Sequence, residues 1–266
     1  MTALAGIDHA LVGALDLEAA RELWTRLGFT LSPRGRHKGW GTGNYCAMFE
    51  CDYVELLGVV DPAGFDNGLQ AMLAERGPGL LGFAIAAADA DAAAAFLAKG
   101  GIPHERKALS RFIELPEGDA EPSFALAMPQ AAYPGAMKPF VCVHESRDLV
   151  WRPEWTRHPN TALGIASLTF VAEDPLALRV PFEAILGRGS ATATVDTLAV
   201  RWGKGAPARC ASARPARWGA LRACSTSTLM PGGGWCRMAR GCANWARACP
   251  RIPARPPSSP SRAHPS

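Results

Sequence analysis

The sequence predicts an α+β fold built from a repeated unit of one strand, one helix and three further strands (βαβββ). Residues 7–58 pass from an apolar strand to an amphipathic helix and then to three short strands. The same order returns after the Pro/Gly break at 77–79, and its beginning appears again from residue 164. We therefore expect module 1 at 1–60, module 2 at 78–145, a linker at 146–162 and an incomplete third module at 163–205.

Module 1 is expected to open with a strand at residues 7–12. Side chains alternate along a strand, so His9 should lie on one face and Asp8 on the other. Asp16 is a good helix N-cap, and the apolar stripe behind it ends at Gly28, where a glycine commonly stops a helix. The remaining strands are expected at 29–31, 45–50 and 53–57, with a turn-rich connection at 34–44.

Module 2 repeats this order. An apolar strand at 80–87 precedes a helix that Asp89 caps and Gly100–Gly101 ends. At the position equivalent to His9, this module has Gly82. Its other strands are expected to begin at residue 102 and to include 111–115, 123–128 and 140–144.

The third module is predicted to contain a strand at 165–171, a helix from Asp174 and two strands at 191–194 and 197–202. Pro181 lies inside the helical stretch, and a proline costs about 3 kcal/mol in an ideal helix interior. We therefore expect a kink or a late helix start. The strand equivalent to 53–57 would fall beyond residue 205, so the module is expected to be truncated.

The charge distribution divides the chain near residue 205. Residues 1–205 hold all 24 Asp and Glu with 18 of the 28 Lys and Arg, whereas residues 206–266 hold ten Arg and no acidic residue. The tail lacks apolar periodicity, so we expect it to be disordered. Its Arg/Pro/Ala/Cys-rich composition is typical of an out-of-frame reading of a GC-rich gene, and we interpret it as frameshifted. A basic arm that binds nucleic acid is the alternative interpretation.

Three segments of module 1 resemble a known family: Gly35–His37, Trp40–Asn44 and Tyr53–Leu57. Together with the βαβββ order, they resemble the glyoxalase-like domain proteins of the vicinal oxygen chelate superfamily, which includes glyoxalases, extradiol dioxygenases and bleomycin-resistance proteins. The linker segments 151–155 and 158–160 are similar to the same group. The resemblance implies that two modules pair, that their curved mixed sheet encloses a half-open cavity, and that a metal often lies at the cavity floor.

Within that resemblance, His9, Glu55 and His144 are the predicted metal ligands. Two imidazoles and one carboxylate suit a divalent Fe, Mn, Ni or Zn ion and leave positions open for water or substrate. Each residue also has an ordinary structural interpretation. His9 would be a core histidine bonded to backbone, Glu55 a buried acid paired with an arginine such as Arg36, and His144 a residue where its strand runs out to solvent.

Glu55 and His37 are the predicted catalytic residues, with Glu55 as general base or ligand. His37 lies in the Gly-rich connection beside Arg34 and Arg36, which would suit an anionic ligand. The alternative for His37 is a surface turn whose glycines serve backbone geometry.

Two functions remain open. One is a metal-dependent lyase, isomerase or dioxygenase acting on a small oxygenated substrate. The other is a metal-free protein that binds or sequesters a small molecule, as Gly82 and the aromatic residues Trp40, Tyr45 and Phe49 would suit.

We expect a small-molecule partner, neither nucleic acid nor membrane, and leave a homodimer open. The sequence shows no N-terminal signal and no apolar run of membrane length, so a cytoplasmic location is the expectation.

Overall fold

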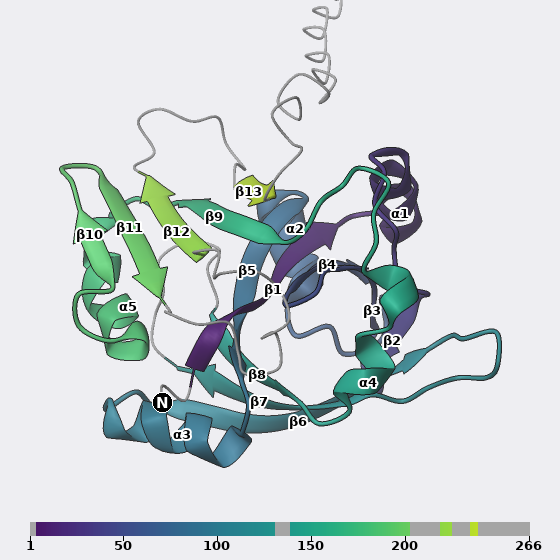
Figure 1. Cartoon of the computed structure of the whole chain (residues 1–266), viewed down its shortest axis with the longest axis horizontal. Coiled ribbons are helices and arrows are strands. Elements are labelled where there is room, and N and C mark those ends of the chain that lie inside the picture. Colours follow the sequence, from purple (N-terminus) through teal and green to yellow (C-terminus); the bar gives the residue numbers. More distant parts are fainter. Residues whose placement is uncertain (1–3, 131–138, 203–218, 225–234, 239–266) are drawn as a thin grey trace, which may run out of the picture.

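The computed structural model describes residues 4–130, 139–202, 219–224 and 235–238. They form two closely packed parts, an eight-stranded barrel and a separate five-stranded sheet (Figure 1). None of the helices in these ranges has the length and apolar character that a membrane crossing requires.

Modules 1 and 2 build the barrel. Module 1 contains β1 (Leu4–Ala14), α1 (Leu17–Arg26), β2 (Gly35–His37), β3 (Thr42–Met48) and β4 (Tyr53–Val59). After α2 (Leu69–Arg76), module 2 contains β5 (Gly79–Ala87), α3 (Ala90–Lys99), β6 (His104–Ile113), β7 (Ser123–Pro129) and β8 (Phe140–His144).

The strand order β1-β4-β3-β2-β6-β7-β8-β5 shows how the modules pair. The first and last strands of each module run parallel, β1 with β4 and β5 with β8. The modules then join through two antiparallel seams, β1 with β5 and β2 with β6. A closed mixed sheet around a cavity results, which confirms the predicted fold class.

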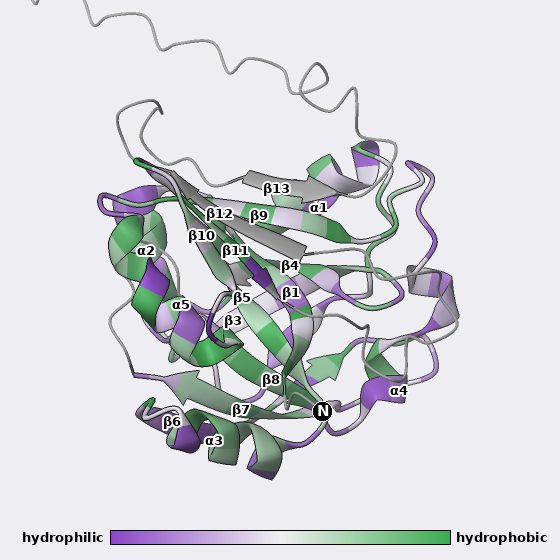
Figure 2. Cartoon of the chain, turned by 60° about the vertical axis from the view of Figure 1, so that its left-hand side comes forward, coloured by the Kyte–Doolittle hydropathy of each residue, from purple (hydrophilic) through white to green (hydrophobic). Residues whose placement is uncertain are grey.

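The helix ends follow the sequence closely. Asp16 Oδ1 accepts a hydrogen bond from the Ala19 amide at 2.9 Å, and Asp89 Oδ1 accepts one from Ala92 at 2.6 Å. Gly28, which follows the C-cap residue Leu27 of α1, has φ +82°, a conformation that glycine adopts without a steric penalty. The Ala-rich helix α3 is coloured hydrophobic over most of its length in Figure 2, in keeping with its position against β6 and β7.

The second strand of module 1 differs from the prediction. Residues 29–31 form no strand, and β2 lies instead in the stretch predicted as a turn-rich connection. Its residues pair with β3 on one side and with β6 on the other. The β6 partners are about 75 residues away in the chain, so this strand depends on a long-range pairing that local composition does not reveal.

A register shift in β1 changes the face on which Asp8 lies. Ile7 pairs with Ile85 and His9 with Ala84, so Asp8 is an extra residue opposite β5. Such a bulge interrupts the alternation of side chains. The prediction that Asp8 and His9 face opposite sides is therefore wrong, because Asp8 contacts the ring of His9 directly.

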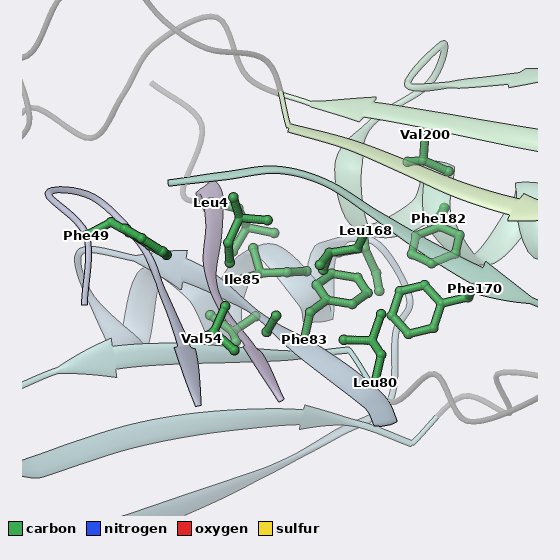
Figure 3. Packing of buried hydrophobic residues seen from close by; sticks show 14 of the residues in the cluster. Leu4, Phe49, Val54, Leu80, Phe83, Ile85, Leu168, Phe170, Phe182 and Val200 are labelled. Atoms are coloured by element: carbon green, nitrogen blue, oxygen red, sulfur yellow. The ribbon is translucent and has the colours of Figure 1, made fainter. Parts of the chain in front are cut away.

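The third module packs against the outside of the barrel. Phe83 of β5 lies 6.0 Å from Phe170 and 6.4 Å from Phe182, measured between ring centres. Figure 3 shows these rings beside Leu168 and Ile85 in one continuous core. The strand β5 thus places Phe83 in this core, while its neighbour Gly82 lines the barrel cavity.

The third module extends further than the sequence predicts. It contains β9 (Ile165–Val171), η2 (Leu176–Leu178), α5 (Arg179–Leu186), β10 (Ala191–Ala193) and β11 (Thr197–Trp202). The strands β12 (Gly219–Cys224) and β13 (Trp235–Met238) come from the segment expected to be disordered. The sheet order is β10-β11-β12-β9-β13.

The β12 pairing gives the third module the same order as the other two. It runs parallel to β9, as β4 runs parallel to β1, and antiparallel to β11. Main-chain hydrogen bonds make this ladder, so an apolar sequence pattern is not needed to place the strand. The other parts of 206–266 lie outside the described residues, and the frameshift remains a prediction.

Pro181 delays the helix as expected. The turn before it is the 3₁₀ helix η2, and α5 begins at Arg179. Pro181 therefore occupies the first turn, where its missing N–H has no intrahelical partner to lose.

The linker packs as an ordered belt through α4 (Arg147–Val150), η1 (Pro153–Trp155) and the buried residue His158. His158 Nε2 donates to the Met48 carbonyl at 2.8 Å, and Nδ1 accepts from the Thr30 amide at 3.0 Å. Its ring meets Phe49 edge-on at 4.9 Å. The His158 imidazole therefore connects the linker to the segment before β2 and to the end of β3.

We predict that His158→Ala lowers the free energy of unfolding by about 3 kcal/mol, because two backbone groups lose their buried partner. Burial lowers the pKa of His158, so the neutral ring stabilises the fold above its ordinary pKa of 6.5 and this stability is lost on acidification. Urea unfolding at pH 7.5 and 5.5 should therefore show a smaller difference between variant and wild type at the lower pH. His104→Ala, at a half-buried histidine, is the control. An equal loss of unfolding free energy in both variants would contradict the stabilising role given to His158.

Candidate functional site

The barrel encloses a cavity of about 170 Å³ that opens on one side. Its walls are mostly apolar, and its polar residues gather on β1, β2, β3, β4 and β6. The apolar lining includes Leu11, Leu57, Leu69, Met72, Leu81, Leu109, Phe124, Leu126, Met128 and Phe140. The polar lining includes His9, His37, Thr42, Asn44, Glu55 and Arg111.

His9 is held in a fixed orientation at the cavity wall. Its Nδ1 lies 2.6 Å from Asp8 Oδ1, and its ring stacks on Tyr53 at 4.5 Å. Nε2 is the nitrogen left for other partners, and it lies 3.5 Å from Glu55 Oε2. His9 is therefore not a core histidine bonded to backbone.

Glu55 is the buried acid of the site. Asn44 Nδ2 donates to its Oε1 at 2.7 Å, and His37 Nε2 lies 3.7 Å from the same oxygen. Burial disfavours the carboxylate, yet the rings of His9 and His37, Arg111 and the Asn44 amide together hold the pKa of Glu55 below its ordinary value. Glu55 is therefore ionised at neutral pH.

Arg36 does not pair with Glu55. It forms exposed ion pairs with Glu114 and Asp119 at 3.0 and 3.8 Å, and Arg34 lies 3.7 Å from Glu18. Both arginines that the sequence associates with an anionic ligand are thus engaged elsewhere.

His37 lies in the cavity wall and not on a surface turn. Its Nδ1 is 2.8 Å from Thr42 Oγ1, which directs Nε2 toward Glu55. Burial is the main cause that lowers the pKa of His37, outweighing the nearby carboxylate. The ring is therefore neutral at neutral pH, beside an ionised acid.

His144 contacts Asp8 and is not among the cavity-lining residues. Its Nε2 lies 3.0 Å from Asp8 Oδ1, and its ring packs edge-on against Trp151 and Phe124. The polar residue that β8 contributes to the cavity lining is Cys142. The structure thus brings His9 and Glu55 together and places His144 behind them, on the other side of Asp8.

Asp8, Asn44 and Arg111 are site residues that the sequence did not single out. Strand alternation could not place Asp8, because the bulge in β1 interrupts it. Arg111 directly precedes the apolar residues Phe112 and Ile113 in its strand, and a charged residue at such a position is a signal that the sequence does contain. Arg111 Nη1 donates to Asn44 Oδ1 at 2.7 Å and to Cys46 Sγ at 3.2 Å.

The glycine of the Gly35–His37 segment is required by this contact. A Cβ at Gly35 would overlap the Asn44 side chain and would lie 3.3 Å from Arg111 Cδ. The backbone of β2 therefore leaves the space in which Asn44 meets Arg111.

His9 Nε2 and Glu55 Oε2 lie at the spacing of two ligand atoms on one divalent ion. Two ligand atoms about 2.1 Å from a tetrahedral ion lie about 3.4 Å apart, and His9 Nε2 lies 3.5 Å from Glu55 Oε2. A carboxylate on the second imidazole nitrogen, here Asp8, is typical of metal-binding histidines.

Cys142 offers a third ligand atom nearby. The ligand atoms of Asp8, His9 and Cys142 all lie within 4.8 Å of one another. Burial raises the pKa of the Cys142 thiol well above its ordinary value, and Asp8 already contacts two imidazoles. His9 and Glu55 are accordingly the better-suited pair.

A family model described as a glyoxalase-like domain matches residues 7–185. The chain belongs to the glyoxalase-like domain family. This membership confirms the resemblance to the vicinal oxygen chelate superfamily. Comparison of the sequence with curated proteins gives no match.

Comparison with solved structures gives several matches to this glyoxalase-like protein. A hypothetical protein from Staphylococcus aureus matches with a TM-score of 0.60 and 12% identity, over 83% of this chain and 86% of that chain. Methylmalonyl-CoA epimerase from Mycobacterium tuberculosis matches with a TM-score of 0.43 and 18% identity, over 57% and 95%. The Streptomyces coelicolor epimerase, in complex with 2-nitronate-propionyl-CoA, gives 0.41 and 20% over 54% and 99%. The first of these matches concerns the fold alone, because its identity is only 12%.

We predict that Asp8→Asn lowers the free energy of unfolding at pH 7 by about 2 kcal/mol, because it weakens two buried charge-assisted contacts. Although burial opposes ionisation, His144 and His9 hold the pKa of Asp8 below its ordinary value of 3.8. The carboxylate therefore stabilises the fold above pH 3.8, and this contribution is lost as the pH falls further.

Chemical unfolding between pH 7 and pH 3 measures this effect. The difference between wild type and Asp8→Asn should shrink below about pH 4. Asp91→Asn, at a carboxylate whose side chain is 83% exposed, is the control with little effect. A difference that stays constant to pH 3 would contradict the role given to Asp8.

Proposed function

We propose that the protein is a metal-assisted isomerase or lyase that moves a proton on a small oxygenated substrate bound in the barrel cavity. The observation that carries the proposal is the buried cluster of His9, Glu55 and His37 at the polar wall of a largely apolar cavity. Clusters of imidazole and carboxylate groups with shifted pKa values in a cavity are typical of acid–base sites.

His9 and Glu55 are the residues that would hold the metal. When bound there, a divalent ion supplies Lewis-acid polarisation of a substrate oxygen. Asp8 keeps the Nε2 atom of His9 directed at Glu55. Asn44 holds one oxygen of Glu55 through a 2.7 Å hydrogen bond and leaves Oε2 for other partners.

His37 is the residue suited to carry the proton. Its pKa is lowered by burial, so the ring is neutral and able to accept a proton at neutral pH. Glu55, whose pKa is also lowered, is a weaker base and is better suited to remain ionised. The contact with Thr42 Oγ1 fixes the ring so that Nε2 faces the cavity side. The apolar walls limit the access of water to this atom.

Isomerase or lyase chemistry is favoured over dioxygenase chemistry by the donor set. A non-haem iron site of the dioxygenase type uses two histidines and one carboxylate around the ion. In this chain the second predicted ligand, His144, contacts Asp8 at 3.0 Å and does not line the cavity. The other histidine beside Glu55 is His37, to which the proposal gives the proton-transfer role instead of a place at the metal.

A metal-free binding protein is the second candidate. The apolar lining and the absence of a side chain at Gly82, which lines the cavity, support it. Under this alternative, Glu55 and His9 would hydrogen-bond a ligand directly, and no proton transfer would follow.

Metal content distinguishes the two candidates. Full-length protein purified without a chelator, and reloaded with Fe, Mn, Ni or Zn in turn, is expected to hold about one divalent ion per chain. His9→Ala should lose it, whereas His104→Ala should keep it. Elemental analysis that finds no ion in the wild type after all four reloadings would leave the metal-free candidate.

Proton exchange tests the role of His37. We expect the wild type to exchange the hydrogen beside the carbonyl of a 2-oxo acid or α-hydroxy ketone in D₂O, observed by proton NMR. His37→Gln should lower the rate at least 100-fold. The acid limb attributed to His37 should lie below its ordinary pKa of 6.5, because that pKa is lowered. His104→Gln is the control, and an unchanged rate in His37→Gln would refute the assignment.

A further inference from the structure

We propose that Arg111 forms an anion subsite inside the cavity and that the substrate is a small organic acid with an apolar chain. This inference rests on the proposed function for the location of the reaction, and it names the substrate class. The carboxylate of the acid would bind the guanidinium, and its chain would lie along the apolar walls.

Arg111 is a buried cation whose hydrogen bonds go to uncharged groups. It is 3% exposed and lines the cavity. Its Nη1 donates to an amide oxygen and to a thiol sulfur, and its Nε is buried without a partner. In the described part of the chain no carboxylate lies within 4.0 Å of it.

A buried charge without a counter-ion is costly, and a guanidinium is well shaped to bind a carboxylate through two parallel hydrogen bonds. Nη2 makes no hydrogen bond to any described residue and is not among the buried atoms without a partner, so it retains contact with solvent or cavity space. A carboxylate in the cavity would therefore bind the edge of the guanidinium that carries Nη2, because Nε is buried.

Asn44 keeps Arg111 and Glu55 apart. Its Oδ1 accepts from Arg111 at 2.7 Å, while its Nδ2 donates to Glu55 at 2.7 Å. The amide therefore takes the place of a direct ion pair, which would neutralise both groups. The arrangement leaves Glu55 for the chemistry and Arg111 for a ligand on the same side of the cavity.

The rest of the cavity sets the size and polarity of the ligand. The walls around Arg111 are formed by Leu109, Phe124 and Leu126, and the opposite wall includes Leu11, Leu57 and Leu81. A dry apolar cavity of roughly 150 Å³ holds a benzene molecule, and the cavity volume here is about 170 Å³. Hexanoate, with a charged head and a short apolar chain, is therefore a suitable probe.

Calorimetric titration of the full chain with hexanoate, 1-hexanol and hexylamine tests the subsite. Hexanoate should bind to saturation, 1-hexanol at least tenfold more weakly, and hexylamine not measurably. Arg111→Gln should weaken hexanoate binding at least tenfold and leave 1-hexanol binding unchanged. Arg36→Gln, at an arginine of the adjacent strand that pairs on the surface, is the matched control and should bind hexanoate like the wild type.

The comparison of the three probes needs only the wild type, so it decides the proposal even where Arg111→Gln fails to fold. Arg111→Lys provides a second variant that keeps the charge and should retain part of the hexanoate binding. Equal binding of hexanoate and 1-hexanol by the wild type, or undiminished hexanoate binding by a folded Arg111→Gln, would overturn the subsite.

Glu55→Gln separates this inference from the proposed function. It should lose proton exchange and still bind hexanoate, because the anion subsite does not use the Glu55 charge. Hexanoate binding in a wild type that exchanges no proton would refute the proposed function and leave the subsite standing. Proton exchange by a wild type that binds hexanoate and 1-hexanol equally would refute the subsite and leave the proposed function standing.

Discussion

The site depends on one constraint, which is that several ionisable groups are buried together inside a closed sheet. Asp8 contacts the imidazoles of His9 and His144, and Glu55 lies between His9, His37 and the Asn44 amide. Arg111 reaches Glu55 only through Asn44. Each group is tolerated in the interior because its neighbours replace part of the water that it loses. The network fixes which nitrogen or oxygen of each side chain faces the cavity.

The pairing of two βαβββ modules makes this burial possible. Parallel β1–β4 and β5–β8 pairs, joined by two antiparallel seams, remove the free edges of the sheet. The polar residues come from β1, β2, β3, β4 and β6, so both modules contribute to one wall. The third sheet has a different role, because it covers the outer face of β5 through Phe83 and none of its described side chains lines the cavity.

Much of this arrangement follows from the sequence. Periodicity and helix caps place α1 and α3, and strand alternation puts His9 and Glu55 toward the same interior. The remainder depends on contacts between distant residues. The bulge at Asp8 arises from pairing with β5, and the contact of Arg111 with Asn44 spans 67 positions in the chain. His144 illustrates the limit of alternation. It lies two residues after Cys142 in β8, yet Cys142 lines the cavity whereas His144 contacts Asp8, the residue of the bulge. The strands of the tail were missed because main-chain pairing leaves no apolar pattern to detect.

Strand β5 separates two volumes with different requirements. Phe83 faces the core shared with the third module, and the adjacent Gly82 faces the cavity. Natural selection can therefore add side-chain volume at residue 82 and change which ligands fit, while the packing that holds the two sheets together is kept by residue 83. Two neighbouring residues of one strand thus allow ligand preference and stability to evolve separately.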